Sequence, residues 1–198
     1  MSHSQSNREP VASEKKAGGL HRPSLPDLRA HLLFWPIVVA GAGLDLWSKT
    51  VVFDWLITKP GAQYHIINGF LKFVMRENSG AAFSIARGQT LMLVSVSVVA
   101  LIAVTGVFLF GKIRPRLMQT ALAMFTAGII GNLYDRITNE GFVRDFIDVY
   151  YGDYHWPAFN VADSMLCISV GILVIATITS GSSGKSPHRQ KQEHPSPR

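Results

Sequence analysis

Four long apolar stretches dominate the pattern of hydrophobic and polar positions along the chain. Residues 90–110 and 164–184 each run 21 residues without a charge, and residues 117–134 add 18 more. About 20 apolar residues cross a bilayer as a helix. A further stretch, residues 32–53, fits this length only if Asp45 and Lys49 are accommodated inside it. The pattern predicts four transmembrane helices, over about residues 32–53, 90–110, 117–134 and 160–180.

Composition supports an all-α membrane protein, because 47% of the residues are hydrophobic and only 16% are charged. No apolar core of a secretory signal precedes residue 32, so we expect the first span to be an uncleaved anchor. Residues 1–31 and 181–198 are rich in Ser, Pro, Gly, Gln and charge. We expect both to be disordered basic tails that flank a membrane domain over residues 32–180.

The basic residues predict the orientation of the spans. Twelve of the nineteen Lys and Arg residues lie in the two tails and in the short loop "GKIRPR". By the positive-inside rule these three segments are cytoplasmic, and residues 54–89 and 135–158 face outward. The net charge of +6 is then explained by topology and by attraction to anionic membrane lipid. We therefore expect no nucleic-acid partner.

Cysteine and histidine usage argues against several chemistries. Cys167 is the only cysteine, which excludes an internal disulfide, a CxxC redox pair and a cysteine zinc cluster, and we expect it to serve packing. The seven histidines show no HxxxH or HxxEH spacing. We expect no metal site and no cofactor.

Carboxylates and amides gather at the predicted outer ends of the spans. The third span ends with Asn132, Asp135 and Arg136, and the fourth opens with Asn160 and Asp163. One interpretation is a polar helix end with local pairing of Asp135 and Arg136, since polar neighbours three or four residues apart on a helix often pair. Asn132 and Arg136 share a helix face in any case.

Asp145 and Asp163 have unlike surroundings. If "FVRDFID" is extended, Asp145 shares a face with Val143 and Ile147, and apolar neighbours raise the pKa of a carboxyl group. Asp163 lies in the first turn of the fourth span, after Asn160 as a possible N-cap. Helix capping is therefore the simpler interpretation of Asp163.

Two carboxylates in unlike environments are also what aspartyl hydrolysis of an amide requires. One stays protonated and polarises the scissile carbonyl group, while the other, ionised, takes a proton from the attacking water. Two carboxylates held close together cannot both ionise, so the pair shares a proton near neutral pH. Such a site needs neither a metal nor a cysteine.

A small transporter or proton relay is the rival interpretation, with Asp45, Lys49, Asp135 and Asp163 as an ionisable path at membrane depth. This interpretation is weakened by the position of the acidic residues, which lie at the outer ends of the spans. No ionisable groups continue the path through the inner half of the membrane. An intramembrane protease of the GxGD type does not fit, because the nearest string, "GAGLD" at residues 41–45, is one residue too long.

Five short blocks resemble those of the lipoprotein signal peptidases, the signal peptidase II family. They are "DLWSK" (45–49), "ENSGAAFS" (77–84), "GNLYDR" (131–136), "VRDF" (143–146) and "FNVADS" (159–164), in the family's order. The resemblance covers about residues 30–180. It implies a multi-pass enzyme of the bacterial inner membrane with its active site near the outer face. The family's enzymes remove signal peptides from diacylglyceryl-modified prolipoproteins, on the N-terminal side of the lipidated cysteine.

The resemblance also implies roles for individual residues. The catalytic pair falls on Asp145 and Asp163, with Asp135 in support. Three further residues, Asn132, Arg136 and Asn160, match family positions that surround the pair and hold substrate backbone or the catalytic water. Asp45 and Asn78 match polar positions nearer the rim. Asp45 can instead form an i,i+4 pair with Lys49, and Asn78 can instead belong to a turn in "NSG".

Two further segments carry expectations. Residues 64–86 hold short β-like runs punctuated by glycine, consistent with the family's small extracytoplasmic β-cradle. The aromatic cluster of Tyr150, Tyr151, Tyr154 and Trp156 is typical of a belt at the lipid headgroups, with a lid over the site as the alternative. Asp148 and Asp153 have no assigned role.

The orientation can be tested by labelling single cysteines in intact cells. We expect a cysteine at position 112 or 183 to be protected from an impermeant thiol reagent, because both positions lie in segments assigned to the cytoplasm. A cysteine at Asp153, in the outward loop, is the matched positive control. Labelling of position 112 or 183 from outside would reverse the assigned orientation.

Overall fold

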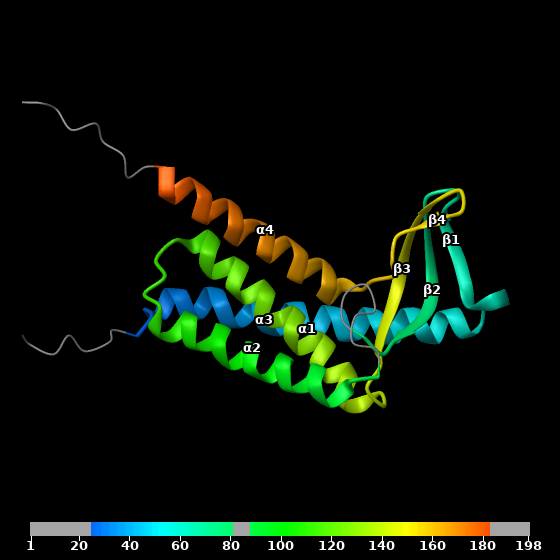
Figure 1. Cartoon of the computed structure of the whole chain (residues 1–198), viewed down its shortest axis with the longest axis horizontal. Helices are drawn as coiled ribbons and strands as arrows, with labels where there is room; N and C mark the ends of the chain where they lie inside the picture. The colour runs from blue at the N-terminus through cyan, green and yellow to red at the C-terminus, as the bar shows by residue number, and fades with distance from the viewer. Residues whose placement is uncertain (1–24, 81–87, 183–198) are drawn as a thin grey trace, which may run out of the picture.

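The computed structural model describes residues 25–80 and 88–182. Within them lie four long helices, α1 (Leu28–Ile57), α2 (Thr90–Phe110), α3 (Arg116–Thr138) and α4 (Val161–Ser182). Each is long and apolar enough to cross a membrane. The helices form an elongated bundle with a small sheet at one end, here called the sheet end (Figure 1). The start of α1 and the end of α4 both lie at the opposite end.

The helices extend beyond the predicted spans at several ends, and α1 runs past residue 53 to Ile57. Helix α1 starts four residues before position 32, because the Asp27 side chain caps it by accepting a hydrogen bond from the Ala30 amide at 2.9 Å. Helix α3 continues through Asp135 to Thr138. Helix α4 includes residues 181 and 182, which the sequence places in the C-terminal tail. The rest of both predicted tails, residues 1–24 and 183–198, lies outside the described residues.

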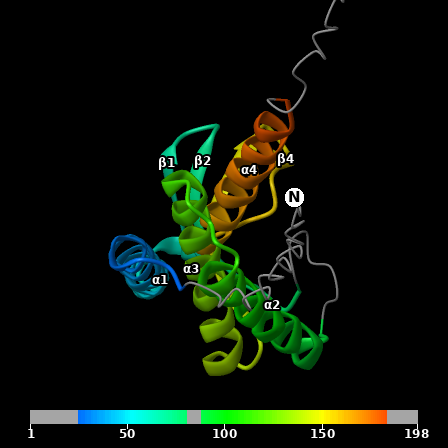
Figure 2. The ribbon, with the colours of Figure 1, turned by 90° about the vertical axis from the view of Figure 1, so that its left-hand side faces the viewer.

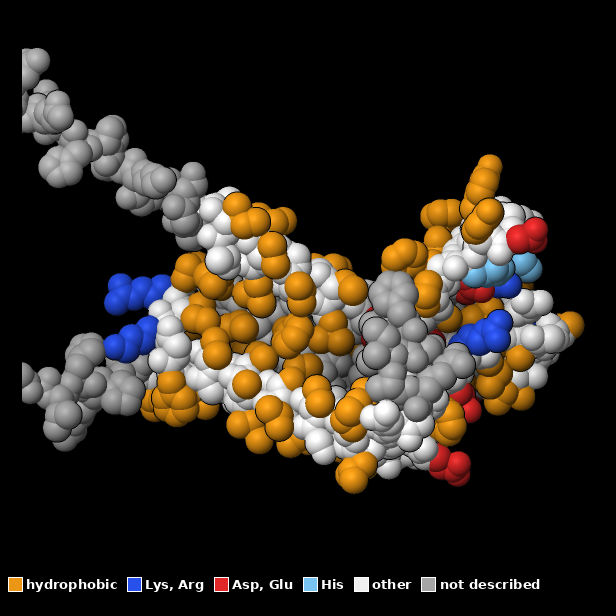
Figure 3. Space-filling model, in the orientation of Figure 1, with side chains coloured by type: hydrophobic (Ala, Val, Ile, Leu, Met, Phe, Trp, Pro, Cys, Tyr) orange, Lys and Arg blue, Asp and Glu red, His pale blue; other side chains and the backbone are white. Residues whose placement is uncertain are grey.

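Helix α3 is the centre of the bundle. Viewed along the bundle, α1, α2 and α4 surround it (Figure 2). Its buried positions are mostly small or aliphatic, and they include Ala121, Ala123, Ala127, Gly128 and Gly131. The outer surfaces of the helices carry apolar side chains, while charged side chains lie at the two ends of the bundle (Figure 3). This distribution is the one that lipid around the helices requires.

Glycines let the helices approach closely. A methyl group on Gly128 would lie 2.7 Å from the carbonyl oxygen of Ala162 in α4, and one on Gly41 would lie 2.9 Å from the Ala127 methyl. A methyl on Gly131 would collide with the Asp45 carboxylate. Small residues at helix contacts are the usual means of close packing between spans. Here they bring α1, α3 and α4 together near the sheet end.

Four antiparallel strands form the sheet, in the order β1 (Gln63–Ile67), β2 (Leu71–Asn78), β3 (Val143–Tyr151) and β4 (Tyr154–His155). A 3₁₀ turn, Pro60–Ala62, leads from α1 into β1. The extended conformation expected for "FVRDFID" is confirmed by β3. Pairing of β2 with β3 places Arg76 opposite Asp145 and Asn78 opposite Val143. The sheet thus joins the loop after α1 to the loop after α3.

Replacing Gly128 by Ala tests the helix packing. The added methyl has no room beside the Ala162 carbonyl, so we expect a loss of about 1–3 kcal/mol, seen as a lower midpoint of thermal unfolding in detergent. Gly171 in α4 is the matched control, because nothing lies within 4 Å of a methyl group there. Gly171→Ala should leave the midpoint equal or slightly higher. Equal midpoints for both variants would contradict the close contact.

Candidate active site

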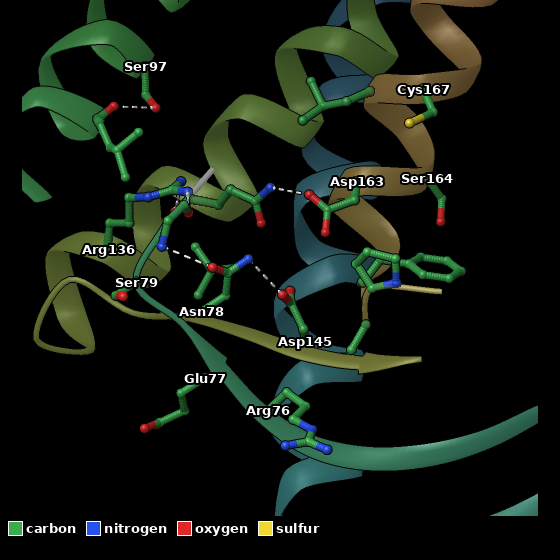
Figure 4. Close-up of a pocket in the computed structure, with 18 of the residues that line it drawn as sticks. Arg76, Glu77, Asn78, Ser79, Ser97, Arg136, Asp145, Asp163, Ser164 and Cys167 are labelled. Carbon is green, nitrogen blue, oxygen red and sulfur yellow. Dashed lines mark hydrogen bonds between the residues drawn. The ribbon is translucent and has the colours of Figure 1, made fainter. Parts of the chain in front are cut away.

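A pocket of about 1070 Å³ lies where the helices meet the sheet. Strands β2 and β3, helices α2, α3 and α4, and the segment before α4 all contribute to its wall (Figure 4). Its polar lining includes Arg76, Glu77, Asn78, Ser97, Asn132, Arg136, Asp145 and Asp163. Its apolar lining includes Leu93, Val96, Val143, Trp156, Phe159, Leu166 and Ile168. The pocket therefore combines a carboxylate site with an extended apolar wall.

Asp145 enters the pocket from β3 and is almost completely buried. Its Oδ1 accepts a hydrogen bond from the side-chain amide of Asn160 at 2.7 Å, and its Oδ2 accepts one from Asn78 at 3.1 Å. Burial and, second, the negative charge of Asp163 together raise the pKa of Asp145 to about 7, against the lowering effect of Asn78, Asn160 and Lys49. The direction expected from the sequence is confirmed. Near neutral pH this carboxyl group holds a proton about half of the time.

Asp163 faces the same pocket from the first turn of α4 (Figure 4). The Asp163 amide donates to Asn160 Oδ1 at 2.9 Å, and Asp163 Oδ2 accepts from the Asn160 amide at 3.2 Å. This reciprocal pair is a capping box, so the capping interpretation of Asp163 is confirmed. The other oxygen, Oδ1, accepts from the Asn132 side chain at 2.8 Å. The cap thus holds the carboxylate at the pocket instead of removing it from the pocket.

Asn132 and Asn160 link the two carboxyl groups. Asn160 donates from its side-chain nitrogen both to Asp145 and to Asn132 Oδ1, the latter at 3.2 Å. Asn132 in turn donates from its side-chain nitrogen to Asp163 Oδ1, which completes a series of hydrogen bonds between the two carboxyl groups. Asn78, expected either at the site or in a turn, takes both roles, since its Oδ1 accepts from the Gly80 amide at 2.9 Å while its nitrogen reaches Asp145.

Asp45 and Asp135 lie behind the pocket and are not part of its lining, so the position near the rim expected for Asp45 is wrong. Both are completely buried, and both contact the ammonium group of Lys49, at 2.7 Å and 3.1 Å respectively. The i,i+4 alternative for Asp45 is therefore confirmed. Its other oxygen accepts from the Ala162 amide in the first turn of α4 at 2.8 Å. Asp45 thereby ties α1 to the helix that carries Asp163.

Asp135 is held by Arg144 instead of by its neighbour in the sequence. Arg144 donates to it from the backbone amide at 3.0 Å and from Nη2 at 2.7 Å. Arg136 points to other partners, the carbonyl groups of Asn132 at 3.2 Å and of Gly80 at 2.9 Å. The prediction that Asp135 pairs locally with Arg136 is thus wrong. The contacts of Lys49 with Asp135 and Asn132 and the pairing of Arg144 with Asp135 were missed, although a lysine inside an apolar span was a signal.

The remaining sequence features lie at the margins of the pocket. Asp148 contacts His155 at 2.9 Å and Lys72 at 3.6 Å, which gives it a structural role in the sheet. Asp153 is exposed. Trp156 lines the pocket, whereas Tyr151 and Tyr154 are exposed at the hairpin. Cys167 is exposed and lines the pocket, so the packing role expected for it is wrong.

The charged groups do not form a path through the bundle. Helix α2 carries no charged residue, and in α3 only Arg116 is charged before Asp135. The described residues contain no group of three or more His, Cys, Asp or Glu side chains arranged to hold a metal ion. The arrangement fits a proton-sharing carboxylate pair beside a substrate pocket better than it fits a relay.

Comparison with known proteins agrees with this geometry. A family model described as signal peptidase (SPase) II matches residues 37–179. Relatives named lipoprotein signal peptidase include one from Rhodopirellula baltica, 38% identical over 73% of this chain and 71% of its own length. Another, from Clostridium novyi, is 36% identical over 73% of this chain and 97% of its own length.

A solved structure shares the fold as well. It is described as a bacterial membrane enzyme determined by the in meso method at 2.3 Å resolution. It is 29% identical, has a TM-score of 0.66, and aligns with 82% of this chain and 94% of its own. Because the family model covers most of the sequence and the relatives align over most of their lengths, the chain belongs to the signal peptidase II family.

Proposed function

We propose that Asp145 and Asp163 are the catalytic pair with which this chain cleaves prolipoproteins immediately before a diacylglyceryl-modified cysteine. Membership of the family makes the chain an aspartic endopeptidase that removes signal peptides from prolipoproteins. The observation that carries the assignment of the pair is its setting. The two carboxyl groups share one pocket, are joined by two amides, and one of them has a pKa of about 7.

The two carboxyl groups divide the chemistry between them. Asp145 holds the shared proton and gives it to the scissile carbonyl oxygen, while Asp163 takes a proton from the attacking water. Water oxygen bonds to the carbonyl carbon and forms a tetrahedral intermediate. When this collapses, the C–N bond breaks, the leaving nitrogen of the cysteine receives the proton taken up by Asp163, and a hydroxyl group of the intermediate returns a proton to Asp145 as the carbonyl group re-forms. Both carboxyl groups then return to their starting states.

The surrounding side chains bind the peptide. Arg136 lies on the pocket wall, and its Nε has no acceptor among the described residues, so it is placed to donate to a substrate carbonyl. Asn78 and Asn160 hold Asp145, and Asn132 holds Asp163. A cleavage region that unwinds in lipid needs such donors, because unpaired backbone groups are costly there.

The apolar wall suits the lipid on the substrate. Leu93, Val96, Leu166 and Ile168 continue the pocket from the carboxyl groups along α2 and α4. Each CH₂ group buried from water contributes about 0.8 kcal/mol, so two acyl chains would hold the modified cysteine firmly. The bound lipid then determines which peptide bond lies next to Asp145 and Asp163.

The sheet end faces outward from the bacterial inner membrane in this proposal, and both tails are cytoplasmic. Lys112 and Arg114 are exposed, and they belong to the connection between α2 and α3. This connection lies at the end of the bundle opposite the sheet (Figure 1), as the positive-inside rule requires. The membrane-embedded peptidase domain then spans about residues 32–180, and the sheet is the cradle above the membrane.

Substitution of the pair tests the assignment. The substrate is one purified prolipoprotein, prepared with and without the diacylglyceryl group, and signal-peptide release is read by gel shift. We expect wild-type protein to cleave the lipidated form only. Asp145→Asn and Asp163→Asn should each reduce turnover by at least about 10⁴-fold, because an amide cannot share the proton or act as a base.

Asp153→Asn is the matched control, because it removes a carboxylate from the same outward region at an exposed position. It should cleave like wild type. Wild-type turnover by Asp145→Asn or Asp163→Asn would exclude that residue from the pair. Equal cleavage of the two substrate forms would exclude the lipid as the determinant of the cleavage site.

The pH dependence of kcat/KM tests which group holds the proton. Because the pKa of Asp145 lies near 7, we expect activity to be present below this pH and to fall as the pH rises through it. The hydrogen bond from Asn78 lowers this pKa, so Asn78→Ala should move the alkaline limb to higher pH. A limb that stays in place in Asn78→Ala would show that it belongs to another group.

A further inference from the structure

Lys49 occupies an unusual position for a lysine. It lies on α1, inside a helix apolar enough to span a membrane, and its side chain is completely buried. An ammonium group has three hydrogens to donate and no acceptor. Here it contacts three oxygens, Asp45 Oδ2 at 2.7 Å, Asp135 Oδ2 at 3.1 Å and Asn132 Oδ1 at 3.1 Å. Two of these contacts neutralise buried charge, and the third is to a residue that touches the active carboxylate.

The third contact determines which way the Asn132 amide faces. Its oxygen receives the Lys49 ammonium and the Asn160 side-chain nitrogen, and its nitrogen donates to Asp163 Oδ1 at 2.8 Å. In the flipped orientation the amide nitrogen would face the ammonium, donor against donor. The amide oxygen would then face the Asp163 carboxylate, acceptor against acceptor. Since Lys49 can only donate, it selects the orientation that gives Asp163 a hydrogen bond.

The contact between Lys49 and Asn132 is also connected to Asp145, the second carboxyl group of the pair. Asn160 donates to Asn132 Oδ1 and to Asp145 Oδ1 from one nitrogen. Asp45, the partner of Lys49 one turn earlier, also accepts from the Ala162 amide next to Asp163. A single buried ion pair on α1 is therefore connected to both members of the carboxylate pair without lining the pocket.

We propose that Lys49 is a positioning residue for the reaction, which fixes the Asn132 amide and thereby the Asp163 carboxylate in the geometry that accepts the proton of water. This inference deepens the proposed function and rests on it. It distinguishes Lys49 from a lysine that only balances charge, because a balancing lysine could be removed together with its partner without loss of chemistry.

The charges around Lys49 allow a balanced substitution. Lys49 contacts the carboxylates of Asp45 on α1 and Asp135 on α3, and its charge also acts on Asp145 of β3. The other charged groups of the cluster act on these carboxylates: Arg144 of β3 pairs with Asp135, and Arg136 of α3 and Asp163 of α4 interact with each other and with Asp145. Removing Lys49 alone leaves Asp45 buried and unpaired. Removing Lys49 and Asp45 together keeps the charge constant, and Asp135 stays paired with Arg144 at 2.7 Å. Asn at position 45 still offers an oxygen to the Ala162 amide.

The experiment compares wild type, Lys49→Met, and the double variant Lys49→Met with Asp45→Asn, on the lipidated prolipoprotein. Lys112→Met, a change at an exposed lysine at the opposite end, is the control and should match wild type. Thermal midpoint, kcat, KM and the pH profile are measured for each. Wild-type protein that fails to cleave would refute the proposed function and not this inference.

We expect the double variant to keep a midpoint near wild type but to lose about 10- to 100-fold in kcat, with KM changed less than about threefold. Its alkaline limb should move to higher pH, because the charge of Lys49 lowers the pKa of Asp145. Wild-type kcat in the double variant would overturn the proposal. The proposal would also be overturned if the alkaline limb of the pH profile did not move and activity fell only in proportion to the amount of folded protein. Failure of the charge-balanced double variant to fold would overturn it as well, because either result makes the role of Lys49 structural.

Discussion

A cluster of four charged side chains, three of them completely buried and one partly buried, links the helices to the sheet. Asp45, Lys49, Asp135 and Arg144 come from α1, α3 and β3, and their charges sum to zero. Placing even one ionised side chain in a membrane costs about 2.5–3.5 kcal/mol on insertion scales, so each of these groups depends on the others. Asp45 and Lys49 pair within α1, and docking of α1 on α3 and β3 joins this pair to Asp135 and Arg144.

Close helix packing makes this cluster possible. The Asp45 carboxylate occupies the space above Gly131, where a methyl group would collide with it. The same narrow spacing puts the Asp45 oxygen on the Ala162 amide, so α1 caps α4. Polar contacts between spans and small residues at the interface are thus parts of one arrangement. The position of Asp163 follows from both.

Local features of the fold could be predicted from the sequence, and long-range ones could not. Apolar length located the four helices, and alternation in "FVRDFID" gave β3 and the unusual surroundings of Asp145. The N-cap spacing from Asn160 to Asp163 was also visible. However, the partner of Asp135 is Arg144, nine residues away across a turn, and Asn132 lies 83 residues from Lys49. Such contacts depend on how helices dock, and the sequence pattern favoured the nearer Arg136 instead.

Helix α1 is longer than a membrane crossing needs. Its 30 residues span about 45 Å, against a hydrocarbon thickness of about 30 Å. The excess continues past Lys49 toward the sheet, with Trp55 packed against Tyr64 of β1 at 4.8 Å between ring centres. Helix α1 therefore contains the apolar stretch long enough to cross a membrane, contributes the buried charges of Asp45 and Lys49, and packs against the first strand of the sheet. Because Asp45 and Lys49 lie on this helix and Asp45 also contacts the Ala162 amide of α4, the number of residues in α1 sets the distance from the start of the bundle to the carboxylate pocket.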